Sequence, residues 1–166
     1  MVADEIAKWL ARNGVNHAFG IIGGGNVVLW DAITRLGSTE LICCHHEQAA
    51  VMAATYYYRT CGKLALALVT TGAGSTNALT GVVAAHMDSV PVLIISGNEA
   101  SKYMNKPTRV WGVQGYDSSG MAGLGCKYST RATGLPDLDS LAKTALTPRQ
   151  GPVWVDIPKD VQSAMV

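Results

Sequence analysis

The stretch that decides the fold runs from Leu64 to Asn77 and reads LALALVTTGAGSTN. Leu64–Thr70 is an almost continuous apolar run, which is typical of a strand buried on both faces. Gly72–Gly74 then predicts a turn, and Thr76–Met87 has the composition and length of a helix. A buried strand that leads through a turn into a helix is the repeating unit of a parallel α/β sheet.

The same alternation of strands and helices extends in both directions along the chain. Further strands are predicted at Val15–Ile22, Leu41–Cys44, Pro91–Ser96, Lys127–Ala132 and Val153–Ile157. Further helices are predicted at Asp4–Asn13, Val27–Leu36, Glu47–Thr60 and Leu138–Leu146. Gly97–Gly125 is expected to be irregular, and Pro158 to end the regular part. The pattern predicts a single α/β domain over residues 1–166, a doubly wound, mostly parallel six-stranded sheet with helices on both faces.

Composition excludes several classes of protein. The 166 residues are 48% hydrophobic and only 15% charged, and 13 Lys and Arg oppose 12 Asp and Glu. This balance argues against a nucleic-acid-binding face and an acidic tail. A low charge content also favours burial of surface against other chains. No apolar run approaches the roughly 18 residues of a membrane span, and no charged leader opens the chain, so we expect a soluble, cytoplasmic protein.

The four cysteines are expected to be reduced and structural. Cys43, Cys44, Cys61 and Cys126 include no CxxC pair, so a zinc ribbon or a thioredoxin motif is not supported. The adjacent Cys43 and Cys44 are expected to point to opposite faces of an apolar strand. Such usage fits a reducing compartment.

Three loops with unusual chemistry follow predicted strands: Ile22–Asn26, His45–Gln48 and Thr70–Asn77. Ligands of open parallel sheets bind beyond the carboxyl ends of the strands, where these loops lie. Backbone amides at the third loop are positioned to hold an anion at a helix start. Its pattern is GxGxxN, however, and it lacks the third glycine of a dinucleotide fingerprint, so a nicotinamide site is a remote alternative to a simple tight turn.

Glu47 is the most informative single residue in these loops. It begins a helix that is almost uncharged, so it serves either as a helix cap or as a functional carboxyl group. The adjacent His45 and His46 do not suit a shared metal ion, and no metal site is expected. Gln114, taken alone, is an ordinary loop glutamine, and His86 is expected in the core or at an interface.

Taken together, the motifs resemble the N-terminal pyrimidine-binding (PYR) domain of thiamine-diphosphate enzymes, and most closely the acetolactate synthase-like branch. The similarity extends from Val2 to Val161, and its order and spacing are specific. The residues that carry it are Phe19–Gly24, His46–Ala50, Tyr58-Arg59, Gly62-Lys63, Thr71–Asn77, Met87–Pro91, Ile95–Gly97, Gln114, Gly151–Val153 and Asp156–Asp160.

The resemblance implies a role for each matching residue. Glu47 would hydrogen-bond N1′ of the coenzyme's aminopyrimidine and favour the imino tautomer that accepts the C2 proton, a task that needs a proton-sharing carboxyl group. Gln114 would lie near the reacting carbon. The residues implied in coenzyme binding are Ile22, Gly23, Gly24, Glu47, Thr71, Gly72, Gly74 and Asn77. Glycines at Gly23–Gly25 and Gly72–Gly74 would allow close approach of the coenzyme and a partner subunit.

The chain departs from the family pattern at several positions. Ile22 and Ala73 replace prolines, Val113 replaces a phenylalanine, and Gly115 replaces an acidic residue. Met121–Cys126 stands where Arg-Pro is more usual, and the helix before Gly151 is about one turn short. The later changes, from Val113 to the short helix before Gly151, would alter the substrate pocket and the C-terminal packing of the family.

The family's other domains have no counterpart in this sequence. Mg²⁺ and the diphosphate are held by a GDG…N signature on a PP domain, and flavin (FAD) is held by a middle domain; both would belong to another chain. The expectation is therefore the PYR half of a 2-keto acid decarboxylase and carboligase, a lyase or transferase only when complemented, which self-associates as a dimer. Alternatives are a subunit of a split sulfopyruvate- or phosphonopyruvate-type decarboxylase, a flavin-dependent acyl transferase acting on a keto-sugar, and a non-catalytic fragment or dimerisation module.

Overall fold

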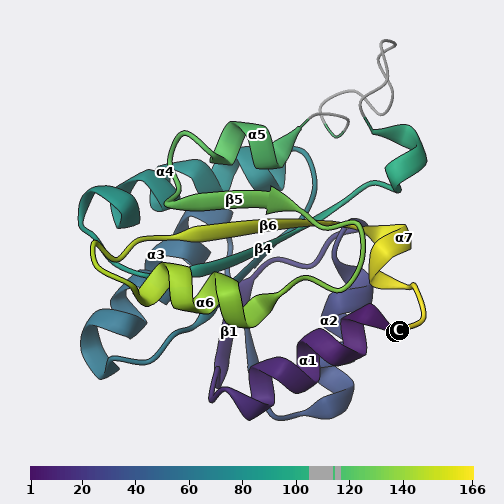
Figure 1. Ribbon diagram of the computed structural model, residues 1–166, viewed down its shortest axis with the longest axis horizontal. Coiled ribbons are helices and arrows are strands. Elements are labelled where there is room, and N and C mark those ends of the chain that lie inside the picture. The colour runs from purple at the N-terminus through teal and green to yellow at the C-terminus, as the bar shows by residue number, and fades with distance from the viewer. Residues whose placement is uncertain (105–113, 115–116) are drawn as a thin grey trace.

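A computed structural model describes residues 1–104, 114 and 117–166, and its strands form one sheet in which every pair is parallel (Figure 1). The order across the sheet is β2-β1-β3-β4-β6-β5. The strands are β1 (His17–Gly20), β2 (Glu40–Cys43), β3 (Leu66–Val69), β4 (Leu93–Asn98), β5 (Tyr128–Arg131) and β6 (Val153–Pro158). This confirms the predicted α/β class, and the sheet is wholly rather than mostly parallel.

Helices cover both faces of the sheet. One face carries α1 (Val2–Arg12), α2 (Val27–Leu36), α6 (Leu138–Leu146) and the short α7 (Lys159–Gln162). The other carries α3 (Glu47–Cys61), α4 (Ala73–Met87) and α5 (Ser118–Ala122). A 3₁₀ turn, η1 (Ser101–Tyr103), follows β4. No helix among the described residues is both long and apolar enough to cross a membrane.

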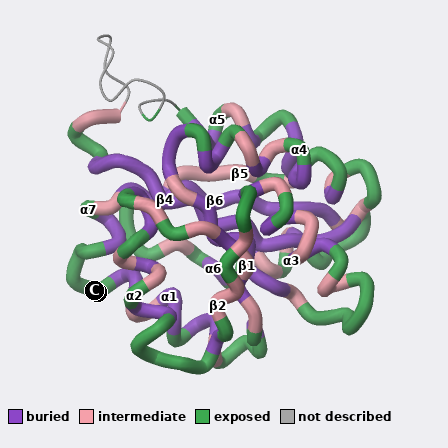
Figure 2. The backbone as a smooth tube through the Cα atoms, turned by 180° about the vertical axis from the view of Figure 1, so that it is seen from behind, coloured by how far each residue is buried: buried purple, intermediate pink, exposed green. Residues whose placement is uncertain are grey.

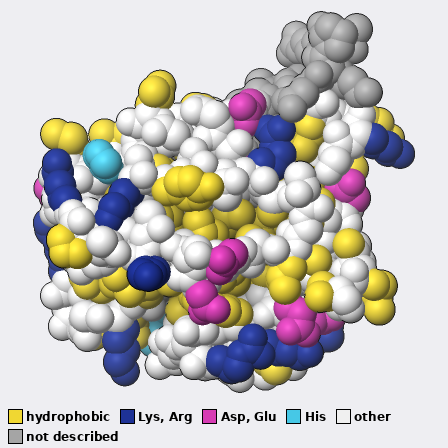
Figure 3. Space-filling model, viewed as in Figure 1, with side chains coloured by type: hydrophobic (Ala, Val, Ile, Leu, Met, Phe, Trp, Pro, Cys, Tyr) yellow, Lys and Arg dark blue, Asp and Glu magenta, His cyan; other side chains and the backbone are white. Residues whose placement is uncertain are grey.

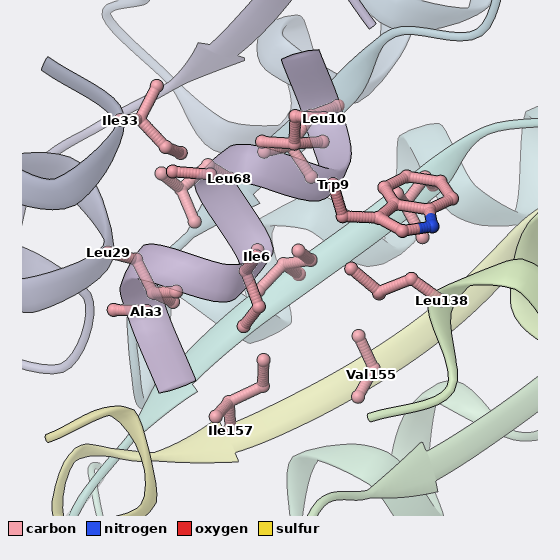
Figure 4. Close-up of a cluster of buried hydrophobic side chains, with 14 of the residues drawn as sticks. Ala3, Ile6, Trp9, Leu10, Leu29, Ile33, Leu68, Leu138, Val155 and Ile157 are labelled. Atoms are coloured by element: carbon pink, nitrogen blue, oxygen red, sulfur yellow. The ribbon is translucent and has the colours of Figure 1, made fainter. Parts of the chain in front are cut away.

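Alternate residues of the central strands belong to two separate hydrophobic clusters, one on each face of the sheet. The backbone of these strands is buried along most of its length (Figure 2). Leu66, Leu68 and Leu93 lie in the cluster formed with α1, α2 and α6, and the close-up shows Leu68 beside Leu10 and Ile33 (Figure 4). Ala65 and Ala67 lie in the cluster formed with α3 and α4, where small side chains allow helices to approach the sheet. A strand buried on both faces explains the unbroken apolar runs in the sequence.

Two helices have the predicted bounds because local signals fix their ends. Gly37, in the left-handed conformation at φ 70°, ends α2, and the Asp137 carboxylate accepts the Ser140 N–H at the start of α6. Three predictions of irregular structure were wrong. Helix α4 begins at Ala73 rather than Thr76, α5 forms within the expected irregular stretch, and α7 follows Pro158.

On the face shown in Figure 3, side chains of Lys and Arg and of Asp and Glu are both present, in keeping with a net charge of +1. Several charged side chains form exposed ion pairs, such as Arg35 with Asp31 and Arg59 with Asp88. Exposed pairs of this kind contribute little to stability.

The four thiols are expected to react at different rates. Only Cys43 belongs to strand β2, so the predicted pair on opposite faces of a strand was wrong; Cys43 and Cys61 are exposed. Burial raises the pKa of Cys44, and raises the pKa of Cys126 to about 12. Near pH 8 a disulfide reagent should modify Cys43 and Cys61 first, Cys44 more slowly and Cys126 only after unfolding, because the thiolate is the reactive form. Equal rates for all four thiols in the folded protein would contradict this assignment.

Candidate functional site

The three unusual loops lie together beyond the carboxyl ends of the strands. They follow β1, β2 and β3, which are adjacent in the order β2-β1-β3, and parallel strands place their carboxyl ends on the same side. After β1 the chain crosses to form β2 on one side of β1, and it then crosses back to form β3 on the other side of β1. In open parallel sheets the usual ligand site lies at such a reversal, beyond the carboxyl ends of the strands. We call this region, where the three loops lie, the candidate site.

Glu47 is held as a side chain of the site rather than as a helix cap. His46 is the N-cap of α3, and its ring nitrogen accepts the Gln48 N–H at 3.2 Å. Glu47 is only 7% exposed, and its Oε2 accepts a hydrogen bond of 3.0 Å from Nδ2 of Asn77 on α4. Among the described residues we find no hydrogen bond to Oε1. The structure therefore brings together two residues that the sequence singled out separately, and leaves the second oxygen of a largely buried side chain for a ligand.

Thr70 fills the space between the two glycine-containing loops. A Cβ at Gly23 would lie 2.5 Å from the Thr70 hydroxyl oxygen, and a Cβ at Gly74 would lie 2.8 Å from Thr70 Cγ2. The Cβ at Gly74 would also approach Glu47 Oε1 to 3.2 Å. These glycines are thus required by contacts within the chain. Gly24, by contrast, has nothing within 4 Å of its Cβ position, so it is free to face a ligand.

The loop after β1 contains a turn that we call the glycine turn (Gly23–Asn26). Its buried residues are held by hydrogen bonds, and exposed residues lie beside them. The buried Asn26 side chain accepts the Gly23 N–H at 2.8 Å and donates to the Ile21 carbonyl at 3.0 Å. Gly25 donates its N–H to the Thr70 hydroxyl at 3.2 Å. Ile22 and Gly24 are exposed. Ile22, Gly23 and Gly24 therefore lie at the candidate site, and their contact with a coenzyme stays a prediction.

The loop after β3 is fixed at Thr71 and Gly72. The Thr71 hydroxyl lies 2.8 Å from Asn98 Oδ1 and 3.0 Å from the carbonyl oxygen of Gln114, either of which can accept its proton. Gly72, with φ 70° and ψ −124°, adopts a backbone conformation that is nearly restricted to glycine and caps α4. Gln114 thus meets the site through its main chain, while its side chain is exposed and its predicted role is untested. Val113 and Gly115 lie outside the described residues.

Beside Thr71 lies a buried polar network that the sequence analysis missed. Asp156, on β6, is fully buried and accepts hydrogen bonds from Asn98 Nδ2 at 2.8 Å and Ser118 Oγ at 2.7 Å. Arg131 Nε lies 3.3 Å from the same carboxylate and its NH2 lies 2.6 Å from Asp117. The network joins the ends of β4, β5 and β6 to helix α5. An aspartate inside the otherwise apolar run VWVDIP is the signal that marks it.

Asp156 is expected to make stability depend on pH. Burial raises the pKa of this carboxyl group above 3.8, although its hydrogen bonds and Arg131 oppose the change. The folded state therefore binds the proton more tightly than the unfolded state. The contribution of Asp156 to the stability of the protein is thus lost as pH rises from 3.8 through the raised pKa. Urea unfolding gives the free energy of unfolding of the wild type and of Asp156→Asn at each pH. The difference between the two should change between pH 3.8 and the raised pKa and should be constant above it. A pH-independent difference would contradict the assignment.

The structure gives no support for other kinds of site at these loops. Within residues 1–104, 114 and 117–166, no group of three or more His, Cys, Asp or Glu side chains is arranged to hold a metal ion. His86 is half-buried on α4, and its buried Nδ1 makes no hydrogen bond to any residue that the structure describes. It lies at the opposite end of α4 from Asn77, away from the candidate site.

Comparison with known proteins agrees with this geometry. The chain is 41% identical over 162 residues to the acetolactate synthase large subunit of Haemophilus influenzae, with 95% of this chain aligned. It is 36% identical over 166 residues to the large subunit from Buchnera aphidicola and 34% identical to that of isozyme 3 from Escherichia coli, with 96% of this chain aligned in each case. The chain spans only 28% of the length of each of these relatives.

A family model gives the more specific assignment. Residues 1–121 match the model described as "Thiamine pyrophosphate enzyme, N-terminal TPP binding domain". The match includes the glycine turn, Glu47 and the loop after β3. It ends before β5, so β5, α6 and β6 are placed by the fold and by the longer alignments with the relatives. The chain belongs to the family of N-terminal, pyrimidine-binding (PYR) domains of thiamine-diphosphate enzymes, in the branch that resembles acetolactate synthase.

Proposed function

We propose that this chain is the PYR half of a thiamine-diphosphate-dependent 2-keto acid decarboxylase and carboligase that resembles acetolactate synthase. The observation that carries the proposal is Glu47, a buried residue at the candidate site whose Oε2 accepts a hydrogen bond from Asn77. Its Oε1 is the oxygen left for a ligand among the described residues. The family membership supplies the coenzyme, and this carboxylate supplies the group that its aminopyrimidine requires.

The residues present fit the pyrimidine end of the coenzyme. Glu47 Oε1 lies beside Gly74, where a Cβ would approach it to 3.2 Å, so the glycine keeps this oxygen accessible. In the proposed complex Glu47 shares a proton with N1′ of the pyrimidine ring, and Asn77 holds the carboxyl group in the orientation that this requires. Ile22, Gly23, Gly24, Thr71 and Gly72 are proposed to contact the ring. Thiamine diphosphate, when bound, supplies the electron sink for 2-keto acid chemistry.

The rest of the active site is proposed to come from outside residues 1–166, which we take as a single PYR domain. The chain spans 28% of the length of its relatives, which supports the proposal that a PP domain is provided by another polypeptide or another part of a longer one. That domain is proposed to bind Mg²⁺ and the diphosphate, and FAD, where it is used, would occupy a further domain. Gln114 is proposed to lie near the reacting carbon.

We further propose that the chain self-associates through its α3–α4 side. Tyr56 on α3 and Val83 and Met87 on α4 are 61%, 46% and 68% exposed, although all three are large and apolar. Burial of such side chains against a second copy is favourable. Sedimentation equilibrium should show a dimer that Met87→Glu and Val83→Glu dissociate; a monomer at all concentrations would contradict this part.

Calorimetry with thiamine diphosphate and Mg²⁺ tests the proposed function. We expect weak or no heat with the chain alone, and tight binding once a protein carrying the GDG…N signature is added. Binding should depend on Glu47, since Glu47→Gln removes the proton-sharing carboxyl group. Absence of binding in both arrangements would overturn the proposal and favour a non-catalytic PYR fragment. Decarboxylation of sulfopyruvate or phosphonopyruvate, with no activity on pyruvate, would favour the split decarboxylase.

A further inference from the structure

A buried glutamine at the end of the last helix holds the glycine turn from behind. Gln162 ends α7 and is 0% exposed. Its Nε2 donates one hydrogen bond to the Gly25 carbonyl at 2.7 Å and another to the Ile157 carbonyl at 2.7 Å. Both amide protons are thereby used, and the side chain joins the end of β6 to a loop 137 residues away in sequence.

Gly25 is fixed on both sides by these contacts. Its N–H donates to the Thr70 hydroxyl at 3.2 Å, and its carbonyl accepts from Gln162. The carbonyl also lies directly over Gly97 of β4, where a Cβ would approach it to 2.0 Å. Every polar main-chain atom of this buried residue therefore has a partner, and each partner comes from a different part of the chain.

The cost of burying Gln162 indicates that its amide serves a purpose. Its Oε1 is buried with no hydrogen bond among the described residues, so half of the amide is unsatisfied. A buried polar group without a partner is destabilising, and an apolar side chain of similar size would avoid the cost. What an apolar side chain cannot provide is the pair of donors to Gly25 and Ile157.

We infer that Gln162 is a positioning residue for the coenzyme-binding face of the glycine turn. The inference rests on the proposed function for the identity of the ligand. Gly25 and Asn26 are the buried part of the turn, Gly24 is its exposed part, and the exposed Ile22 directly precedes it. Because Gln162 holds the buried part of the turn, the exposed part is already in a single conformation before the coenzyme binds. Pre-ordering of this kind lowers the entropic cost of binding.

Hydrogen exchange of the chain alone tests the positioning role without any coenzyme. In Gln162→Met, which keeps the length of the side chain and removes both donors, amide exchange over residues 22–27 should accelerate about tenfold or more relative to exchange in β3 and β4. The matched control is Val161→Ala, because Val161 is buried on the same short helix and makes apolar contacts. This control should lower stability without accelerating exchange in the turn selectively. Unchanged exchange in Gln162→Met would overturn the inference.

A measurement on the wild type applies even if Gln162→Met does not fold. Both Nε2 protons of Gln162 should exchange with water at least tenfold more slowly than those of an exposed glutamine, since both are hydrogen-bonded in the interior. Fast exchange of either proton would overturn the inference. In the complemented protein, Gln162→Met should weaken thiamine diphosphate binding about tenfold while Val161→Ala leaves it unchanged. If the wild type binds no coenzyme, the proposed function fails, and the two exchange measurements still decide whether Gln162 holds the turn.

Discussion

Glu47→Gln is expected to weaken the binding of thiamine diphosphate by about 10- to 100-fold in the complemented protein. Hydrogen bonds to charged groups contribute about 1.5–3 kcal/mol, and each 1.4 kcal/mol corresponds to about tenfold in affinity. Glutamine keeps the shape of the side chain and the acceptor for Asn77, but it cannot share a proton with the pyrimidine ring. Decarboxylation should fall further, by about 100-fold or more, because proton transfer is also lost. Calorimetry and a steady-state assay measure the two effects.

The matched control for this variant is Glu40→Gln. Glu40 lies on β2, the strand that leads to Glu47, but its side chain is 71% exposed. The control should bind the coenzyme as the wild type does, and both variants should unfold at nearly the wild-type temperature. Equal affinities of Glu47→Gln and Glu40→Gln would show that the buried carboxylate does not contact the coenzyme.

Gly97→Ala is expected to cause the largest loss of stability of any single methyl addition at the site. Its Cβ would lie 2.0 Å from the Gly25 carbonyl oxygen and 2.7 Å from the Asn26 nitrogen, and both are main-chain atoms that cannot rotate away. The glycine turn would have to shift, at a cost of about 3 kcal/mol or more. For a chain of this size that lowers the melting temperature by about 6–12 °C. Thermal unfolding followed by circular dichroism measures the change.

Gly24→Ala provides the comparison, because it changes the same turn. No atom lies within 4 Å of the Cβ position at Gly24, so the free energy of unfolding should change by no more than about 0.5 kcal/mol. Gly24→Ala is expected to change coenzyme binding without changing stability, since Gly24 is exposed at the candidate site. Equal destabilisation by the two variants would mean that Gly97 does not support the turn.

Sequence alone predicted the elements whose ends are marked locally. Gly37 marks the end of α2 and Asp137 marks the start of α6. The apolar run before Thr70 predicts a strand buried on both faces. The start of α4 was missed because Gly72 is read as the beginning of a turn. The left-handed backbone at Gly72 is instead the step by which β3 enters the helix at once. Such a step depends on the packing around Thr70, which no local pattern encodes.

The same distinction holds for the site. Glu47 and Asn77 were both singled out, but their hydrogen bond depends on the packing of α3 against α4. Asp156 was named only as part of the family resemblance, and its buried network was not predicted, although a carboxylate in an apolar strand is a recognisable signal. Gln162 gave no signal, because a glutamine at the end of a short helix is ordinarily exposed. Its burial follows only from the return of α7 to the glycine turn.

The most direct test of the central claim is the ¹⁵N chemical shift of N1′ in labelled thiamine diphosphate bound to the complemented protein. If Glu47 shares a proton with this nitrogen, the shift should move from the value of the free coenzyme toward that of a protonated ring nitrogen in the wild type. In Glu47→Gln it should remain near the free value. Identical shifts in the two proteins, with the coenzyme bound in both, would contradict the account.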